Sequence, residues 1–107
     1  MNYRKVTAII PSMSLDETEQ ALLAIGVKGM TITKVHGLGE YRNYYSRDNL
    51  SDCGRIEIFT EQENARHIAE TIARTVHQGL SSDGVIAILP VEDFIHISEF
   101  EEVSHDG

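Results

Sequence analysis

Two helical patterns, each flanked by strand-like segments, constrain the fold of this chain most. Residues 5–10 (KVTAII) are apolar and β-branched, and a helical pattern after them closes at Gly26. Residues 55–59 (RIEIF) alternate between charged and apolar, and residues 29–37 and 85–91 also have strand character. The second helical stripe comprises Ala65, Ile68, Ala69, Ile72, Ala73 and Val76. This order predicts an α+β, ferredoxin-like βαββαβ fold, an antiparallel sheet with two helices on one face.

The helix starts and the last strands can be predicted in more detail. Ser14 and Thr60 each stand three residues before a glutamate, which is the spacing of a capping box. The run VIAILPV (residues 85–91) is almost entirely apolar, as is typical of a central strand covered by helices on one face and close to a subunit contact on the other. The segment FIHIS (residues 94–98) predicts a last short strand.

Composition narrows the class of protein. The 107 residues fit a single domain, 1–107, with one cysteine, Cys53, as expected in a reducing compartment. Nine Lys and Arg against seventeen Asp and Glu give a net charge of −8, which argues against a nucleic-acid partner. No apolar run approaches the roughly 18 residues that span a bilayer, and the first fifteen residues lack a secretory pattern. We therefore expect a cytoplasmic protein that does not insert into membranes.

The predicted fold leaves one face of the sheet uncovered. Two helices can bury only one side of four strands, so the opposite face must be polar or covered by copies of the chain. The predicted sheet residues are mixed in polarity. This pattern predicts an oligomer.

Three segments carry a resemblance to a known family. They are GVKGMTITKVHGLGEY (26–41), RIEIF (55–59) and QGLSSDGVIAILPVEDFIHI (78–97), and their order and spacing resemble the PII signal-transduction family. The most specific pieces are GMTITKVHGLG and SDGVIAILPVE. The resemblance covers almost the whole chain except an acidic tail at about 99–107.

The resemblance implies a compact homotrimer that binds an adenine nucleotide in three clefts between subunits. Its T-loop would span about 37–54 and its B-loop about 79–84. In the family, occupancy of the clefts sets the T-loop conformation, and the T-loop engages a target such as a membrane transporter or an enzyme. The chain would then be a regulator with an adenine nucleotide as effector and no tightly bound cofactor.

The candidate nucleotide-binding residues come from the glycine-rich segment, two strands, the B-loop and the C-terminal segment. They are Thr31, Gly37, Leu38, Gly39, Glu40, Phe59, Ser82, Asp83, Gly84, His96 and Ser98. Gly37 and Gly39 would let the backbone approach a ligand and adopt positive φ, and residues 81–84 can form a nest of N–H groups for an anion. Both motifs also occur in ordinary turns.

Four cations of the family pattern are absent. Glu40, Val85, His96 and Ser98 stand where relatives that hold ATP have basic residues. A triphosphate near Glu40 would meet repulsion. AMP or ADP is therefore expected to bind better than ATP, with a small anion such as bicarbonate as an optional co-ligand.

The loop between the two central strand segments is shorter than a typical T-loop, with fifteen residues from Glu40 to Gly54. It contributes the candidate partner-binding residues Tyr41, Arg42, Tyr44, Tyr45 and Arg47. Tyrosine and arginine anchor many interfaces because they combine a large area with a polar end. The alternative is an ordinary solvated hairpin, and no tyrosine can be matched to a modification site.

Histidines keep a second function open. His36 and His96 would meet at the cleft if the family geometry holds, so a metal-ion-binding or metal-tolerance protein on the same trimeric scaffold is the alternative. Two histidines without a cysteine or carboxylate at ligand spacing are a weak metal signal, and we assign no metal ligand. His67 and His77, ten residues apart on the predicted helix, would face different directions. No nucleophile and base stand at a recognisable spacing, so we expect no enzyme.

Overall fold

The computed structural model describes residues 2–37 and 51–102. Four strands and two α-helices alternate with short 3₁₀ turns. The elements are β1 (Tyr3–Pro11), a 3₁₀ turn (Ser12–Ser14), α1 (Leu15–Ala24), β2 (Thr31–Gly37), β3 (Ser51–Glu61), α2 (Gln62–Val76), a 3₁₀ turn (Ser81–Asp83), β4 (Val85–Val91) and a 3₁₀ turn (Ile97–Glu99).

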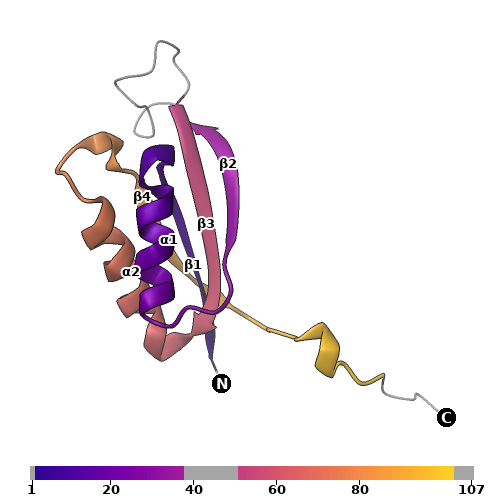
Figure 1. Cartoon of the computed structure of the whole chain (residues 1–107). Coiled ribbons are helices and arrows are strands. Elements are labelled where there is room, and N and C mark those ends of the chain that lie inside the picture. Colours follow the sequence, from indigo (N-terminus) through magenta and orange to yellow (C-terminus); the bar gives the residue numbers. More distant parts are fainter. Residues whose placement is uncertain (1, 38–50, 103–107) are drawn as a thin grey trace.

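The four strands form one antiparallel sheet in the order β2-β3-β1-β4. Val6 of β1 lies between Ile58 of β3 and Ile88 of β4, which fixes the register on both sides of β1. Both helices cover the same face of the sheet, and the other face is open (Figure 1). The predicted ferredoxin-like fold is confirmed.

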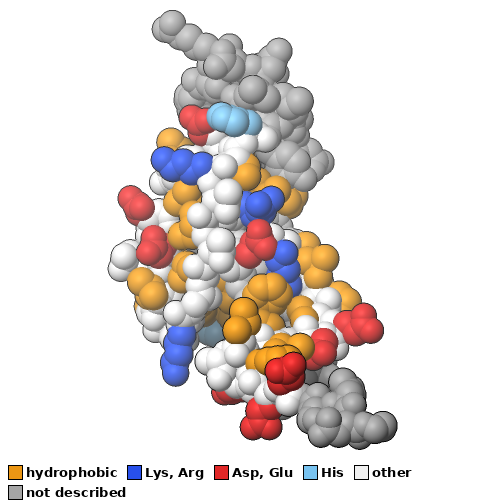
Figure 2. Space-filling model, turned by 90° about the vertical axis from the view of Figure 1, so that its right-hand side faces the viewer, with side chains coloured by type: hydrophobic (Ala, Val, Ile, Leu, Met, Phe, Trp, Pro, Cys, Tyr) orange, Lys and Arg blue, Asp and Glu red, His pale blue; other side chains and the backbone are white. Residues whose placement is uncertain are grey.

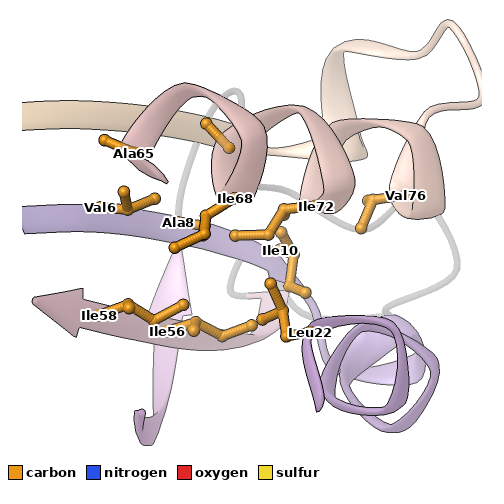
Figure 3. Close-up of a cluster of buried hydrophobic side chains, with 11 residues drawn as sticks. Val6, Ala8, Ile10, Leu22, Ile56, Ile58, Ala65, Ile68, Ile72 and Val76 are labelled. Atoms are coloured by element: carbon orange, nitrogen blue, oxygen red, sulfur yellow. The ribbon is translucent and has the colours of Figure 1, made fainter. Parts of the chain in front are cut away.

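The hydrophobic core lies between the sheet and the helices (Figure 3). Alternate residues of β1 and β3 point into it because side chains alternate along a strand. The buried cluster is Val6, Ala8, Ile10, Leu22, Ile56, Ile58, Ala65, Ile68, Ala69, Ile72 and Val76. Burial of a side chain such as Ile72 contributes about 1.5–3 kcal/mol. The predicted stripe on α2 is thus confirmed except at Ala73, which is exposed.

The two predicted capping boxes are wrong. Ser14 belongs to the 3₁₀ turn before α1 and makes no side-chain cap, although its carbonyl accepts a hydrogen bond from Thr18 Oγ1 at 2.7 Å. Thr60 is a strand residue opposite Arg4, so β3 continues to Glu61, which is the N-cap of α2. At Thr60, pairing of the strand with β1 therefore replaces the predicted cap.

Two predictions about the C-terminal strands are also wrong. β4 is an edge strand in the single chain, because β1 takes the central position beside β3. Five of its seven residues are exposed. The segment 94–98 forms no strand: it is irregular as far as His96 and then enters the last 3₁₀ turn. Phe94 stacks on Tyr3 instead, with 4.5 Å between ring centroids.

The predicted T-loop loses residues to the sheet at both ends. Gly37 is the last residue of β2 and pairs with Ser51, and Gly54 lies between Lys34 and Ile10. Leu15 of α1 packs directly on Gly54, and a Cβ at Gly54 would overlap the Leu15 side chain. Gly37 and residues 51–54 thus belong to the sheet, and residues 38–50 lie outside the described part of the chain.

None of the helices within residues 2–37 and 51–102 is both long enough and apolar enough to cross a bilayer.

Candidate functional site

A cavity of about 600 Å³ opens where β2 begins and β3 ends, and we call it the aromatic cavity. Its walls include three of the predicted nucleotide-binding residues, Thr31, Phe59 and His96. Phe94 brings the C-terminal segment to this place, with its ring 5.3 Å from that of Phe59 and 4.9 Å from the imidazole of His96. The result is a cluster of flat rings at the mouth of an open cavity.

The charged side chains of the aromatic cavity are acidic. Glu57 and Glu61 line it, and among the described residues no Lys or Arg does. Lys5 lies behind this wall, with Nζ 2.6 Å from Glu57 Oε2 and 5.9 Å from the centre of the Phe59 ring. The hydrogen bond from Lys5 lowers the pKa of Glu57, so this carboxylate is charged at neutral pH. The ammonium group of Lys5 is therefore already paired.

The second group of candidates lies in the segment 78–84, which we call the Asp83 loop. Asp83 Oδ2 accepts hydrogen bonds from the backbone N–H groups of Gln78 at 2.8 Å, Gly79 at 2.9 Å and Leu80 at 3.3 Å. These bonds, led by that from Gln78, lower the pKa of Asp83. These three N–H groups belong to residues 78–80, directly before the predicted nest at 81–84, and they hold the chain's own carboxylate.

Gly84 ends the Asp83 loop and turns the chain into β4. Its φ of +112° is in a region that residues with a side chain rarely adopt. A Cβ at this position would overlap the carbonyl oxygen of Ile9 on the neighbouring strand. Gly84 is therefore required by the fold, whatever its part in ligand binding.

The two groups lie at opposite ends of the sheet. Phe59 is opposite Lys5, whereas Val85, directly after the Asp83 loop, is opposite Ile9. Four residues of strand correspond to about 13 Å. A single chain therefore does not bring Thr31, Phe59 and His96 together with Ser82, Asp83 and Gly84, and the exposed Ser98 lies beyond both groups in the C-terminal segment.

The histidines are also separated. His36 is near the end of β2, five residues after Thr31, and its Nδ1 is 3.4 Å from Asp52 Oδ1. His96 is at the aromatic cavity. Within one chain these two histidines therefore lie apart, and their meeting in a cleft between subunits stays a prediction. His67 is on α2, but His77 follows the end of that helix. In the part of the chain that the structure describes, no group of three or more His, Cys, Asp or Glu is placed to hold a metal ion.

The remaining candidates lie outside the described residues. These are the nucleotide-binding candidates Leu38, Gly39 and Glu40 and the partner-binding candidates Tyr41, Arg42, Tyr44, Tyr45 and Arg47.

Sequence reasoning missed Tyr3 and Phe94, which complete the aromatic cavity. Phe94 was assigned to a strand because its neighbours alternate, and no local pattern shows that its ring reaches Tyr3, which is far away in the sequence. One sequence signal could have indicated that Phe94 lies outside a strand. It is an aromatic residue just beyond a strand end that contains proline, as in PVEDF.

Comparison with known proteins decides the family. The family model described as "Nitrogen regulatory protein P-II" matches residues 3–101. The chain belongs to the P-II family. Membership makes it a signalling protein of the P-II type, and the resemblance seen in the sequence is confirmed.

Individual P-II proteins are similar over nearly their whole length. The nitrogen regulatory protein P-II of Azospirillum brasilense is 32% identical over 107 aligned positions, which cover 92% of this chain and 95% of the relative. P-II 1 of Escherichia coli K12 is 33% identical with the same coverage. The crystal structure of Arabidopsis thaliana PII bound to citrate has a TM-score of 0.77 and 29% identity, and covers 94% of this chain and 87% of that one.

Proposed function

We propose that the chain is a homotrimeric P-II regulator that binds AMP or ADP in preference to ATP in clefts between subunits. Binding would act through the loop 38–50 on a target such as a membrane transporter or an enzyme. The observation that carries the proposal is the aromatic cavity, with flat rings on its walls and no cation among its described lining residues.

The open face of the sheet supports assembly. Phe59, Leu89 and Val85 are 49%, 42% and 38% exposed, and strand register places all three on this face. Figure 2 shows hydrophobic side chains there interspersed with charged ones. Such a mixed surface is typical of interfaces, which pair an apolar area with polar groups. Assembly through this face would also let the aromatic cavity of one subunit meet the Asp83 loop of another.

Nucleotide preference follows from shape and charge. A base can stack on Phe59 and Phe94, and base–aromatic stacking contributes about 1–3 kcal/mol per base. A polyphosphate reaching the same cavity would meet the carboxylate of Glu61, whereas Glu57 is already paired with Lys5 and Arg55. Two like charges 4 Å apart repel by about 4 kcal/mol near a protein surface. Each added phosphate therefore weakens binding unless a cation is supplied.

Small anions remain part of the proposal. The Arabidopsis thaliana protein is described as bound to citrate, which is a small polycarboxylate. Bicarbonate and citrate therefore belong in the titration beside the nucleotides.

Calorimetry on the purified protein tests the proposal, after light scattering has established its mass. We expect a trimer that binds AMP or ADP at least about tenfold more tightly than ATP. Phe59→Ala should weaken AMP binding by about tenfold, since stacking is lost. The matched control is Leu23→Ala on α1, because Leu23 is also 49% exposed. A monomer, or ATP binding as tight as AMP binding, would overturn the proposal.

A further inference from the structure

A cavity of about 250 Å³ lies between the connection from α1 to β2 and the start of α2, and we call it the Lys28 cavity. Residues 25–29 form one wall, and Asn64, His67 and Ile68 of α2 form another. Figure 1 shows this connection running from the end of α1 to β2, beside the start of α2. Of the predicted nucleotide-binding residues that the structure describes, only Phe59 lines this cavity.

The inner part of the Lys28 cavity is apolar. Ile58 and Ile68, which are 2% and 5% exposed, belong to the hydrophobic core and form its floor. Val27 also lines the cavity and packs against the same core. Ile25 is 37% exposed at its side, so apolar area is left to cover. A ligand that fills the cavity therefore needs an apolar part.

The polar side chains of the Lys28 cavity stand at its mouth. Lys28, Asn64 and His67 line it, and all three are exposed. In the described part of the chain, no hydrogen bond or ion pair engages their side chains. An ammonium group, an amide and an imidazole can each donate a hydrogen bond to an oxygen atom. The mouth therefore offers several donors to one oxygen-containing group.

The charge at the mouth is positive. Among the described residues, no Asp or Glu lines the Lys28 cavity. Glu70 follows His67 by one turn of α2, but it is already paired with Arg66 and Arg74, at 2.9 Å and 3.2 Å. The ammonium group of Lys28 is thus available to an anion from outside the chain.

Three other cavities among the described residues differ in this respect, because each includes an acid. The aromatic cavity is lined by Glu57 and Glu61. The cavity beside the Asp83 loop, of about 330 Å³, is lined by Asp83. A cavity of about 360 Å³ between α2 and β4 is lined by Glu70 as well as Arg66. An anionic ligand with an apolar part is therefore matched best by the Lys28 cavity.

The lining also restricts the charge of the ligand. One ammonium group pairs well with one carboxylate. A second carboxylate would lie on the apolar floor without a partner, and burial of an unpaired charge is costly. A phosphate group carries nearly two negative charges at neutral pH and would need a further cation. An ammonium group on the ligand, as in an amino acid, would find no acid in the described lining.

The volume restricts the size of the ligand. An apolar cavity of about 150 Å³ holds benzene, so 250 Å³ gives room for roughly ten non-hydrogen atoms. A carboxylate with a short apolar chain has this size.

We propose that the Lys28 cavity binds a small monocarboxylate with a short apolar chain. The carboxylate lies at the mouth, where Lys28, Asn64 and His67 donate hydrogen bonds to it. The chain lies on Ile58 and Ile68 and covers the apolar area that is exposed in the free protein.

This ligand would affect the aromatic cavity, because the two cavities share a wall. Gly29, Phe59, Thr60 and Asn64 line both of them. Coupling between two sites is reciprocal, so the monocarboxylate and a nucleotide should change each other's affinity by the same factor, about fivefold or more. This step rests on the proposed function, whereas binding of the monocarboxylate alone does not.

Calorimetry on the purified protein without nucleotide tests the site. The probe is isocaproate, which has the carbon skeleton of leucine without the amino group. We expect saturable binding at one site per chain, at least about tenfold tighter than that of leucine, which adds an ammonium group, or of glutarate, which adds a second carboxylate. Absence of binding, or equal binding of the three compounds, would overturn the inference.

A lysine substitution tests the role of the cation. Lys28→Gln should weaken isocaproate binding by about tenfold, because a charge-assisted hydrogen bond is lost. Lys34→Gln is the matched control, since Lys34 is also an exposed lysine and lies on β2 outside this cavity. Circular dichroism should show that both variants are folded. Equal affinities of the two variants would contradict the assignment.

Backbone amide NMR locates the ligand. Isocaproate should shift the signals of residues 25–29 and 64–68 most. Shifts centred on Tyr3, Phe94 and His96 would place it in the aromatic cavity and overturn the inference.

The outcomes separate this inference from the proposed function. Binding of AMP without binding of isocaproate overturns the inference and leaves the proposed function standing. Binding of isocaproate without binding of AMP or ADP overturns the proposed function and leaves the Lys28 site standing. Binding of both, with AMP affinity unchanged by saturating isocaproate, overturns the coupling between the two cavities.

Discussion

The two ends of the sheet differ in the chemical groups that form their surfaces. At the aromatic cavity, side chains form the surface, and its charged groups are carboxylates with no cation lining it among the described residues. At the Asp83 loop, backbone N–H groups form the surface, and Asp83 of the same chain accepts from three of them. The first end is an open cavity of aromatic and acidic side chains. At the second end the backbone N–H groups of residues 78–80 already donate to Asp83.

This difference predicts that the loop end depends on backbone geometry and the cavity end on side-chain chemistry. Substitutions at the loop end should act mainly on stability. Substitutions at the cavity end should act mainly on ligand choice, at a smaller cost in free energy of unfolding.

The largest effect is expected from Gly84→Ala. The new Cβ meets the carbonyl of Ile9 and is strained at a φ of +112°, so the free energy of unfolding should fall by about 3–5 kcal/mol. Gly26→Ala is the control, because Gly26 also has positive φ, +90°, but open space around it. Its cost should be about 1–2 kcal/mol. Equal losses in urea unfolding would show that steric contact with β1 is unimportant.

Asp83→Asn should have the next largest effect. Hydrogen bonds to a charged group contribute about 1.5–3 kcal/mol, and the amide accepts less strongly. Because the native environment lowers the pKa of Asp83, its contribution is present above about pH 4 and is lost as the pH falls through the lowered pKa. Urea unfolding of the variant should therefore lose the part of the acid dependence that Asp83 provides. Asp93→Asn, an exposed residue, serves as the control.

Phe94→Ala should destabilise the chain by about 1–2 kcal/mol, because its contacts with Tyr3 and Phe59 are lost. The effect on ligand should be larger than that of a comparable loop substitution, since the ring also forms the cavity. Calorimetry with AMP and thermal unfolding measure the two effects. A stable variant with unchanged AMP affinity would contradict the assignment of the cavity.

Val85→Lys should have the smallest effect on stability and a selective effect on binding. The cation follows the Asp83 loop, so it should raise ATP affinity relative to AMP by up to about tenfold through phosphate contact. Leu89→Lys is a matched control, because it lies on the same strand and the same face at the other end. The proposal would be contradicted if both lysines changed the ratio of ATP to AMP affinity equally.

Periodicity predicted the fold well because it reports on burial. Residues of the α2 stripe from Ala65 to Val76 and the alternate residues Ile56 and Ile58 of β3 are buried in the same core. Their periodicity in the sequence therefore reflects the face of each element that is buried. Periodicity could not show where β4 lies in the sheet, because an apolar run is compatible with two positions. It fits a central strand, and it also fits an edge strand with exposed apolar side chains. It also could not show that Thr60 would pair with Arg4. Whether Thr60 caps a helix or extends a strand depends on the presence of β1 beside it, which is distant in the sequence.

The site was predicted in part. Thr31, Phe59 and His96 line one cavity, and their binding of a nucleotide stays a prediction. The role of Asp83 was not foreseen, because an aspartate before glycine indicates a turn and leaves open which N–H groups its carboxylate will accept from. The stacking of Phe94 on Tyr3 depends on contacts between distant residues.

The pairing of Gly37 with Ser51 fixes the distance between the two ends of the segment 38–50. Paired residues of neighbouring strands are about 5 Å apart, so the sheet itself closes this segment. A longer insertion there adds little closure entropy, about 0.6 kcal/mol for each doubling of length. An insertion within β3, by contrast, would turn Ile56 and Ile58 out of the core. The length of this segment can therefore change while the register of β2 and β3 and the core behind them stay the same.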